Sequence, residues 1–113
     1  MPLTAPAEID AQTLRRLLAE DRAVLVDVRE AEEFEEERIP GARLVPLSTF
    51  DPRQVAAAAA GRPVVLYCLS GKRAGKAAAA LAPHHSAVLT LKDGIFGWVG
   101  AGLPTEAANG PAG

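Results

Sequence analysis

The stretch Pro63-Val64-Val65-Leu66-Tyr67-Cys68-Leu69-Ser70-Gly71-Lys72-Arg73 joins an apolar run to a short polar loop. The run 63–68 is uncharged and rich in β-branched residues, which predicts a buried strand. The Ala-rich segment that follows predicts a helix from about Arg73 to Ala82, stopped by Pro83. A strand that leads through a tight loop into a helix is typical of a parallel α/β unit.

The same alternation extends to both sides of this unit. Buried strands are predicted at 23–28 (AVLVDV) and 87–91 (AVLTL), with a brief strand at 43–47. Helices are predicted from Asp10 through Leu14, Leu17 and Leu18, over 31–37, from Asp51 to Gly61, and over 94–99. Parallel strands joined by helical crossovers are covered on both faces. We therefore expect a three-layer α/β fold with about five, mostly parallel strands and helices on both faces.

The length of 113 residues suits one compact domain. Residues 1–7 contain two prolines and little pattern, and residues 105–113 (TEAANGPAG) are small, polar and rich in Gly and Pro. We expect both segments to be flexible, with the folded domain over 8–104.

Composition excludes several classes of function. A net charge of -2 gives no reason to expect nucleic acid or an anionic membrane as a partner. One cysteine rules out an internal disulfide framework and a Cys-rich zinc site, and we expect neither metal nor cofactor. No apolar stretch approaches the roughly 18 residues of a membrane span, and residues 1–10 do not resemble a signal peptide. We expect a cytoplasmic protein whose size fits a monomer.

Cys68 is the candidate nucleophile, because ligand sites of such sheets lie at the carboxyl ends of the strands. The free N–H groups of the next helix, together with its dipole, point toward this position. With the cations of Lys72 and Arg73 they are expected to favour the thiolate, and Gly71 allows the loop to curl around it. The candidate binding residues are those of the loop: Leu69, Ser70, Gly71, Lys72 and Arg73. The alternative is a buried structural cysteine, a common fate for this residue.

Other polar residues have structural interpretations. His84 and His85 lie a full helix away from Cys68, at the opposite edge of the sheet, so a Cys–His dyad is not expected. Asp27 and Arg29 are predicted to form a structural ion pair. The acidic run 30–37 is interpreted as a solvated helix face, and Trp98 as a core aromatic.

Four segments in order resemble a rhodanese-like domain from about Asp10 to Pro104. They are Val26-Asp27-Val28-Arg29 with Glu33-Phe34; Ile39-Pro40-Gly41-Ala42; Tyr67 to Arg73; and Asp93-Gly94 with Trp98 and Gly102-Leu103-Pro104. The resemblance implies a sulfurtransferase of the thiosulfate type, in which Cys68 becomes a persulfide. The implied donor is thiosulfate or a protein-borne or low-molecular-weight persulfide, and a thiophilic acceptor removes the sulfur.

Loop length and three departures refine the resemblance. Cys-based phosphatases carry Arg after five intervening residues, where this chain has Ala74, so the shorter loop ending at Arg73 resembles that of sulfur-handling members. Glu37-Arg38 replaces the usual Gly-His, and Asp93-Gly94 replaces Gly-Gly; both are expected to tune packing. Leu69 stands where a polar or basic residue is common, which favours a less polar or protein-borne partner.

Three other functions remain open at this stage. A non-catalytic binding module could use the same loop to recognise a partner. A thiol redox sensor would oxidise Cys68 instead of loading it with sulfur. A phosphatase or arsenate reductase is disfavoured by the loop length.

Overall fold

The computed structural model describes residues 7–107 and 110–111. Its centre is a five-stranded sheet in which every neighbouring pair is parallel. The strand order is β1 (Ala7–Ile9), β5 (Val88–Leu91), β4 (Val64–Tyr67), β2 (Val24–Asp27) and β3 (Arg43–Leu44). The three-layer parallel α/β fold predicted from the sequence is confirmed.

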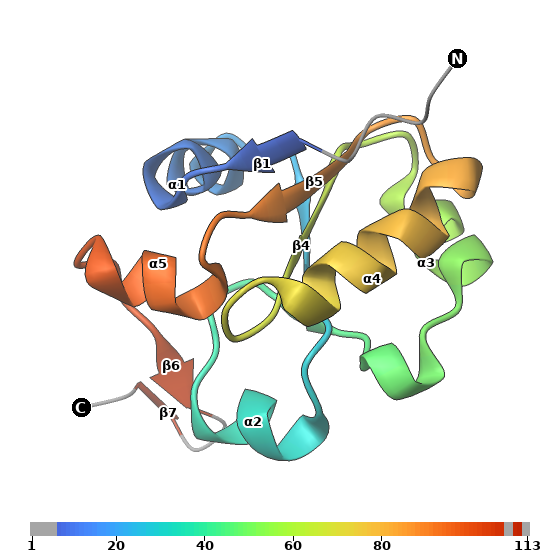
Figure 1. Cartoon of the computed structure of the whole chain (residues 1–113). Coiled ribbons are helices and arrows are strands. Elements are labelled where there is room, and N and C mark those ends of the chain that lie inside the picture. The colour runs from blue at the N-terminus through green and yellow to red at the C-terminus, as the bar shows by residue number, and fades with distance from the viewer. Residues whose placement is uncertain (1–6, 108–109, 112–113) are drawn as a thin grey trace.

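Helices cover both faces of the sheet (Figure 1). On one face lie α3 (Pro52–Ala59) and α4 (Lys72–Leu81), and on the other lie α1 (Ala11–Ala19) and α5 (Gly94–Gly100). Alternate residues of β4 serve the two layers, because successive side chains of a strand point to opposite faces. Leu66 and Cys68 join the α3–α4 layer, whereas Val65 and Tyr67 join the α1–α5 layer.

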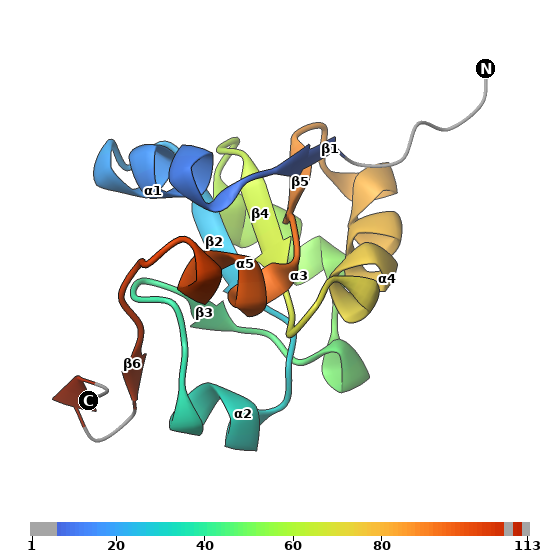
Figure 2. The same cartoon turned by 60° about the vertical axis from the view of Figure 1, so that its left-hand side comes forward.

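The helix α2 (Ala31–Glu36) covers neither face. It lies beyond the end of the sheet, on the side where the loop between β4 and α4 turns (Figures 1 and 2). A capping box begins it, in which Glu30 and Glu33 satisfy each other's backbone N–H groups. This position leaves α2 free to contact the loop that follows Cys68.

Local signals placed most helix ends correctly. The Asp10 side chain accepts a hydrogen bond from the Thr13 N–H at 2.8 Å and begins α1. Asp51 accepts from the Arg53 N–H at 3.0 Å and begins α3, with Pro52 at the first position. The helix after Cys68 begins at Lys72, one residue earlier than predicted, and a short 3₁₀ turn, η2 (Ala82–His84), follows it at Pro83.

The ends of the chain hold more regular structure than we expected. The strand β1 begins at Ala7 and pairs with β5, and the segment β6 (Glu106–Ala107) pairs with β7 (Gly110–Pro111). Arg38 and Glu106 also exchange backbone hydrogen bonds of 2.8 and 2.9 Å. Flexibility of 1–7 and 105–113 stays a prediction, and residues 1–6, 108–109 and 112–113 lie outside the described residues.

The predicted strand at 43–47 is shorter in the structure. The strand β3 covers only Arg43–Leu44. The chain still follows β2: Val45 N–H donates to Asp27 O at 2.9 Å and Leu47 N–H to Val28 O at 3.0 Å. A second 3₁₀ turn, η1 (Leu47–Thr49), then leads to α3.

Candidate active site: the Cys68 loop

Cys68 is the first residue after β4, at the carboxyl edge of the sheet. Its thiol is free, and the residue is only 1% exposed. The neighbouring strand runs alongside, and Val28 N–H donates to Tyr67 O at 3.0 Å. The sheet therefore holds the cysteine backbone rigidly and leaves the loop beyond it to shape the surroundings of the sulfur.

Two backbone N–H groups converge on the sulfur of Cys68. Gly71 N–H donates to Sγ at 3.0 Å, and Ala74 N–H donates to Sγ at 3.4 Å. Gly71 has φ +131, a backbone conformation that side chains disfavour. Together with the dipole of α4, these donors stabilise negative charge on sulfur.

The sequence correctly predicted that backbone N–H groups converge on Cys68, but the predicted set of residues ended at Arg73, one residue before Ala74. Of the loop residues expected to bind, Gly71 donates to Sγ, whereas Ala74 was not in the expected set. Ala74 is the third residue of α4, and the first four N–H groups of any helix lack a partner within the helix. The rule that predicted free N–H donors at the start of this helix therefore applies to Ala74 as well.

The N-terminus of α5 supports the loop from the opposite side. Ile95 N–H donates to Cys68 O at 2.9 Å, and Phe96 N–H to Leu69 O at 3.4 Å. Gly94 makes this approach possible, since a Cβ there would lie 2.6 Å from Leu69 O. Gly94 is the glycine that the Asp93-Gly94 departure retains, and it packs against the cysteine loop. The effect of Asp93 on packing stays a prediction.

Arg73 forms a bidentate ion pair with Glu33. Its two terminal nitrogens donate to the two carboxylate oxygens at 2.7 and 3.0 Å, and both side chains are 33% exposed. The Arg73 guanidinium lowers the pKa of Glu33 from 4.5 to about 2. The Glu33 carboxylate raises the pKa of Arg73, although partial burial of the guanidinium opposes this shift.

This ion pair corrects one expectation and adds to another. The interpretation of the acidic run as a solvated face was wrong for Glu33, which anchors α2 to the cysteine loop. The cation of Arg73 was expected to favour the thiolate, and the structure adds that the Glu33 carboxylate shares this charge. No local signal predicts the contact, because the two residues are 40 positions apart. The other loop residues, Leu69, Ser70 and Lys72, are exposed at the rim of the site.

Asp27 and Arg29 form the predicted structural ion pair. The Asp27 carboxylate is fully buried and accepts from Arg29 Nη2 at 2.7 Å and from the Arg29 backbone N–H at 2.8 Å. Burial alone would lower the pKa of Arg29, and the Asp27 carboxylate more than offsets this, so the pKa is raised. Arg29 also donates to Glu37 O at 2.6 Å, which fixes the end of α2.

Tyr67 also stabilises the region around Arg29. Its hydroxyl accepts a hydrogen bond from Ile39 N–H at 3.2 Å, and the Arg29 guanidinium lies 5.6 Å from its ring centre. Burial, with the charge of Asp27 adding to it, raises the pKa of Tyr67 above its ordinary value. Tyr67 is therefore a neutral acceptor that ties the turn at Ile39 to the sheet.

The two histidines lie away from the thiol, as predicted. His84 belongs to η2, and His85 Nε2 lies 2.8 Å from Arg62 O, near the start of β4. Within residues 7–107 and 110–111, no group of three or more His, Cys, Asp or Glu is arranged to hold a metal. No helix in this described part of the chain is both long and apolar enough to cross a membrane.

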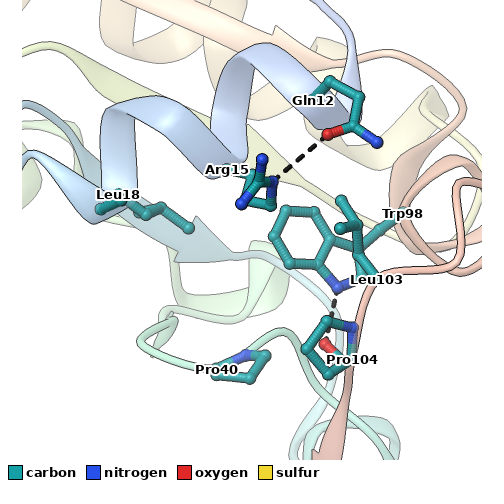
Figure 3. A pocket seen from close by; sticks show the side chains of 8 residues that line it. Gln12, Arg15, Leu18, Pro40, Trp98, Leu103 and Pro104 are labelled. Atoms are coloured by element: carbon teal, nitrogen blue, oxygen red, sulfur yellow. Dashed lines mark hydrogen bonds between the residues drawn. The ribbon is translucent and has the colours of Figure 1, made fainter.

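A hollow of about 660 Å³ lies on the other side of the sheet (Figure 3). Its walls include Trp98, Pro104 and Arg15, and Trp98 Nε1–H donates to Pro104 O at 2.7 Å. Trp98 is 3% exposed and belongs to the core layer opposite Cys68, so its predicted packing role is confirmed. The hollow does not include the cysteine loop.

Comparisons with known proteins agree with this geometry. A family model described as rhodanese-like domain matches residues 10–101. A protein of Allochromatium vinosum named sulfurtransferase is 37% identical over 105 residues, which cover 91% of this chain and 97% of that protein. An uncharacterised protein of Synechocystis sp. is 40% identical over 105 residues, which cover 91% of this chain. The match spans only 58% of that relative's length.

One solved structure extends the comparison to three dimensions. The crystal structure of a thiosulfate sulfurtransferase from Pseudomonas aeruginosa superposes with a TM-score of 0.76 at 31% identity. The match covers 94% of this chain and 21% of that one. The likeness therefore concerns one domain of a longer protein.

Proposed function

Because this chain belongs to the rhodanese-like domain family, we propose that it is a sulfurtransferase that carries sulfane sulfur on Cys68. The observation that carries the proposal is the pair of N–H groups, from Gly71 and Ala74, directed at Sγ. Donors held at the N-terminus of a helix stabilise a sulfur anion before any substrate arrives. The Allochromatium relative named sulfurtransferase, which matches almost end to end, supports the same activity.

The first step loads the cysteine. The Cys68 thiolate attacks the outer sulfur of a donor, either thiosulfate or a persulfide. With thiosulfate, a bond forms between Sγ and the outer sulfur, and the sulfur–sulfur bond of the donor breaks. Its electron pair leaves with sulfite, and the negative charge of the thiolate passes to the terminal sulfur of the new persulfide.

The second step removes the sulfur from Cys68. A thiophilic acceptor, which is cyanide in an assay or a thiolate, attacks the terminal sulfur of the persulfide. The new bond joins that sulfur to the acceptor, and Cys68 leaves as the thiolate that began the cycle. The donors from Gly71 and Ala74 can hold the cysteine sulfur in both states, so no histidine base is needed.

The redox-sensor alternative loses support from burial. Sensor cysteines are solvent-accessible, whereas Cys68 is 1% exposed. A non-catalytic binding module would use the same fold without sulfur transfer. The sulfurtransferase and the binding module differ in whether sulfur accumulates on Cys68.

Steady-state turnover tests the proposal. The reduced protein is incubated with thiosulfate and cyanide, or with a low-molecular-weight cysteine persulfide and cyanide, and thiocyanate is measured. We expect thiocyanate from the wild type and none above background from Cys68→Ser. If a folded, reduced wild type turns over neither donor, the sulfurtransferase proposal fails and the binding module replaces it.

A further inference from the structure

The helix α2 lies beyond the carboxyl edge of the sheet, on the side of the loop that surrounds Cys68 (Figures 1 and 2). The structure describes all six of its residues, and none of them is buried. A helix this short is not stable by itself in water, so contacts with its neighbours must hold it in place. These contacts can break without opening the core.

The thiol is closed off from solvent in this arrangement. Cys68 is 1% exposed, whereas a donor needs space to meet Sγ in line with the bond that breaks. Some element beside the loop must therefore move when a donor arrives. The turn η1 packs on the core through Leu47. The helices α4 and α5 place several residues in the core: Ala74, Ala77, Ala78 and Leu81 from α4, and Gly94, Ile95 and Trp98 from α5. A movement of α2 breaks the least packing.

Two polar contacts join α2 to the surroundings of the thiol. The ion pair of Glu33 with Arg73 ties the helix to the cysteine loop, because Arg73 lies between the two residues whose N–H groups donate to Sγ. At the start of the helix, the Glu30 carboxylate accepts a hydrogen bond from the Ser48 hydroxyl at 3.0 Å. Partly exposed polar contacts of this kind are weak, so they permit α2 to move.

Arg38 holds the other end of α2. Its guanidinium carbon lies 4.6 Å from the centre of the Phe34 ring, and its Nη1 donates to Phe34 O at 3.4 Å. Its Nε donates to the Glu106 carboxylate at 3.3 Å. The backbones of Arg38 and Glu106 also exchange hydrogen bonds of 2.8 and 2.9 Å. One side chain thus joins the last turn of α2 to the segment at Glu106.

A second bond supports the same connection. The Thr105 hydroxyl donates to the Glu37 carboxylate at 2.8 Å. Glu37 and Arg38 are the two residues that replace the usual Gly-His, and both contact the segment 105–106. The attachment of α2 at this end therefore depends on side chains particular to this chain.

We propose that α2 is a lid over Cys68, and that Arg38 is the positioning residue that keeps it closed through Phe34 and Glu106. In the closed state Glu33 pairs with Arg73 and the thiol is buried. In the open state this pair separates and a donor reaches Sγ, while the N–H donors stay in place because they belong to the loop and α4. The inference rests on the proposed function and deepens it by naming what limits access to Cys68.

Alkylation of the thiol measures the opening without any sulfur transfer. Cys68 is the only cysteine, so every label reports on it alone. The reagent is N-(1-pyrenyl)maleimide, which is bulky and uncharged. Rates are taken from the plateau of the pH profile, where all of the thiol is thiolate and a change in its pKa has no effect. The proteins are the wild type, Arg38→Ala, Glu33→Gln and two controls.

We expect Arg38→Ala and Glu33→Gln each to raise the plateau rate about three- to tenfold, because each removes a contact of the closed state. The controls should stay within about twofold of the wild type. Arg16→Ala makes the same change as Arg38→Ala at an exposed residue of α1, on the opposite face of the sheet. Glu36→Gln makes the same change as Glu33→Gln at an exposed residue of α2.

Urea separates a lid from a residue that merely stabilises the fold. Opening α2 exposes little surface, so the added rate in Arg38→Ala should hardly change in low, non-denaturing urea. Alkylation through global unfolding would instead rise steeply with urea. If Arg38→Ala does not fold, Glu106→Pro serves in its place, because it removes both the carboxylate and the N–H that bind Arg38, and it must raise the rate likewise.

Sulfur donors of two sizes connect the lid to the proposed function. The wild type, Arg38→Ala and Arg16→Ala are loaded with thiosulfate or with glutathione persulfide, and the gain of sulfur is followed by intact mass. Arg38→Ala should speed loading by the bulky persulfide about three- to tenfold and loading by thiosulfate less. Arg16→Ala should match the wild type with both donors.

The outcomes separate the two proposals. If Arg38→Ala is folded and its alkylation rate equals that of the wild type, or if its added rate rises steeply with urea, α2 is not a lid and the proposed function stands. If neither donor loads the wild type although Arg38→Ala gains alkylation rate as expected, the lid is supported and the proposed function alone fails.

Discussion

Gly94 lies so close to Cys68 that a side chain at Gly94 would collide with the Cys68 carbonyl oxygen. The contact joins the first turn of α5 to the loop that surrounds the sulfur, and the hydrogen bond from Ile95 N–H to Cys68 O at 2.9 Å maintains it. The shape of the cysteine loop thus depends on a helix that follows it in the chain and supplies none of the donors to Sγ.

Replacing Gly94 with Ala tests this relationship. The new Cβ would lie 2.6 Å from Leu69 O, and Gly94 has φ +55, so the substitution combines overpacking with backbone strain. We expect a loss of about 2–3 kcal/mol in the free energy of unfolding, measured with urea, and a slower loading of Cys68. Gly100→Ala is the matched control in α5, since nothing lies within 4 Å of the position that its new methyl group would occupy, and its stability should change by about 1 kcal/mol or less. Equal effects of the two substitutions would contradict the contact.

The buried ion pair of Asp27 and Arg29 supports a second prediction. Asp27→Asn leaves a nearly buried guanidinium without a compensating charge, because the Arg29 side chain is only 4% exposed. We expect the free energy of unfolding to fall by about 3–5 kcal/mol. Asp21→Asn makes the same change in a surface pair with Arg62, where the Asp21 side chain is 89% exposed, and should cost no more than about 0.5 kcal/mol. Urea titrations of the two variants decide the point, and similar losses would refute it.

Features that depend on neighbouring residues were predicted from the sequence, whereas features that depend on contacts between distant segments were not. The order of helices and strands came from short apolar runs and from caps such as Asp10 and Asp51, which act over three or four residues. The position of Cys68 at a strand end and the donors of the next helix are local in the same sense. The contact of Glu33 with Arg73 and the packing of Gly94 on the loop join distant segments. No pattern within one segment could predict them.

The short strands illustrate the same limit at the edges of the fold. The strand β1 has three residues, too few for an alternating pattern, and it exists because the edge of β5 offers partners for its backbone. The segment at Glu106 is ordered by backbone pairing with Arg38, 68 residues earlier in the chain. Such elements become visible only when the sheet and α2 are already in place.

The ion pair of Glu33 with Arg73 predicts how stability changes with acid. Arg73 lowers the pKa of Glu33 from 4.5 to about 2, so its contribution is complete above pH 4.5 and is lost as the pH falls toward 2. The pair is one-third exposed, and we expect the loss to amount to about 0.5–1 kcal/mol. Urea unfolding of the wild type and Glu33→Gln at pH 5 and pH 2.5 measures it. The advantage of the wild type should shrink at the lower pH, and an advantage that stays constant would contradict the prediction.

Sulfane sulfur on Cys68 is the central claim, and intact mass after a single loading step tests it most directly. The reduced wild type and Cys68→Ser are mixed with thiosulfate or a cysteine persulfide, freed of excess donor, weighed, and then treated with cyanide. We predict that the wild type gains the mass of one sulfur atom and returns to its original mass with one equivalent of thiocyanate, whereas Cys68→Ser gains nothing. A folded, reduced wild type that gains no sulfur from either donor, or a Cys68→Ser protein that gains as much as the wild type, would contradict it.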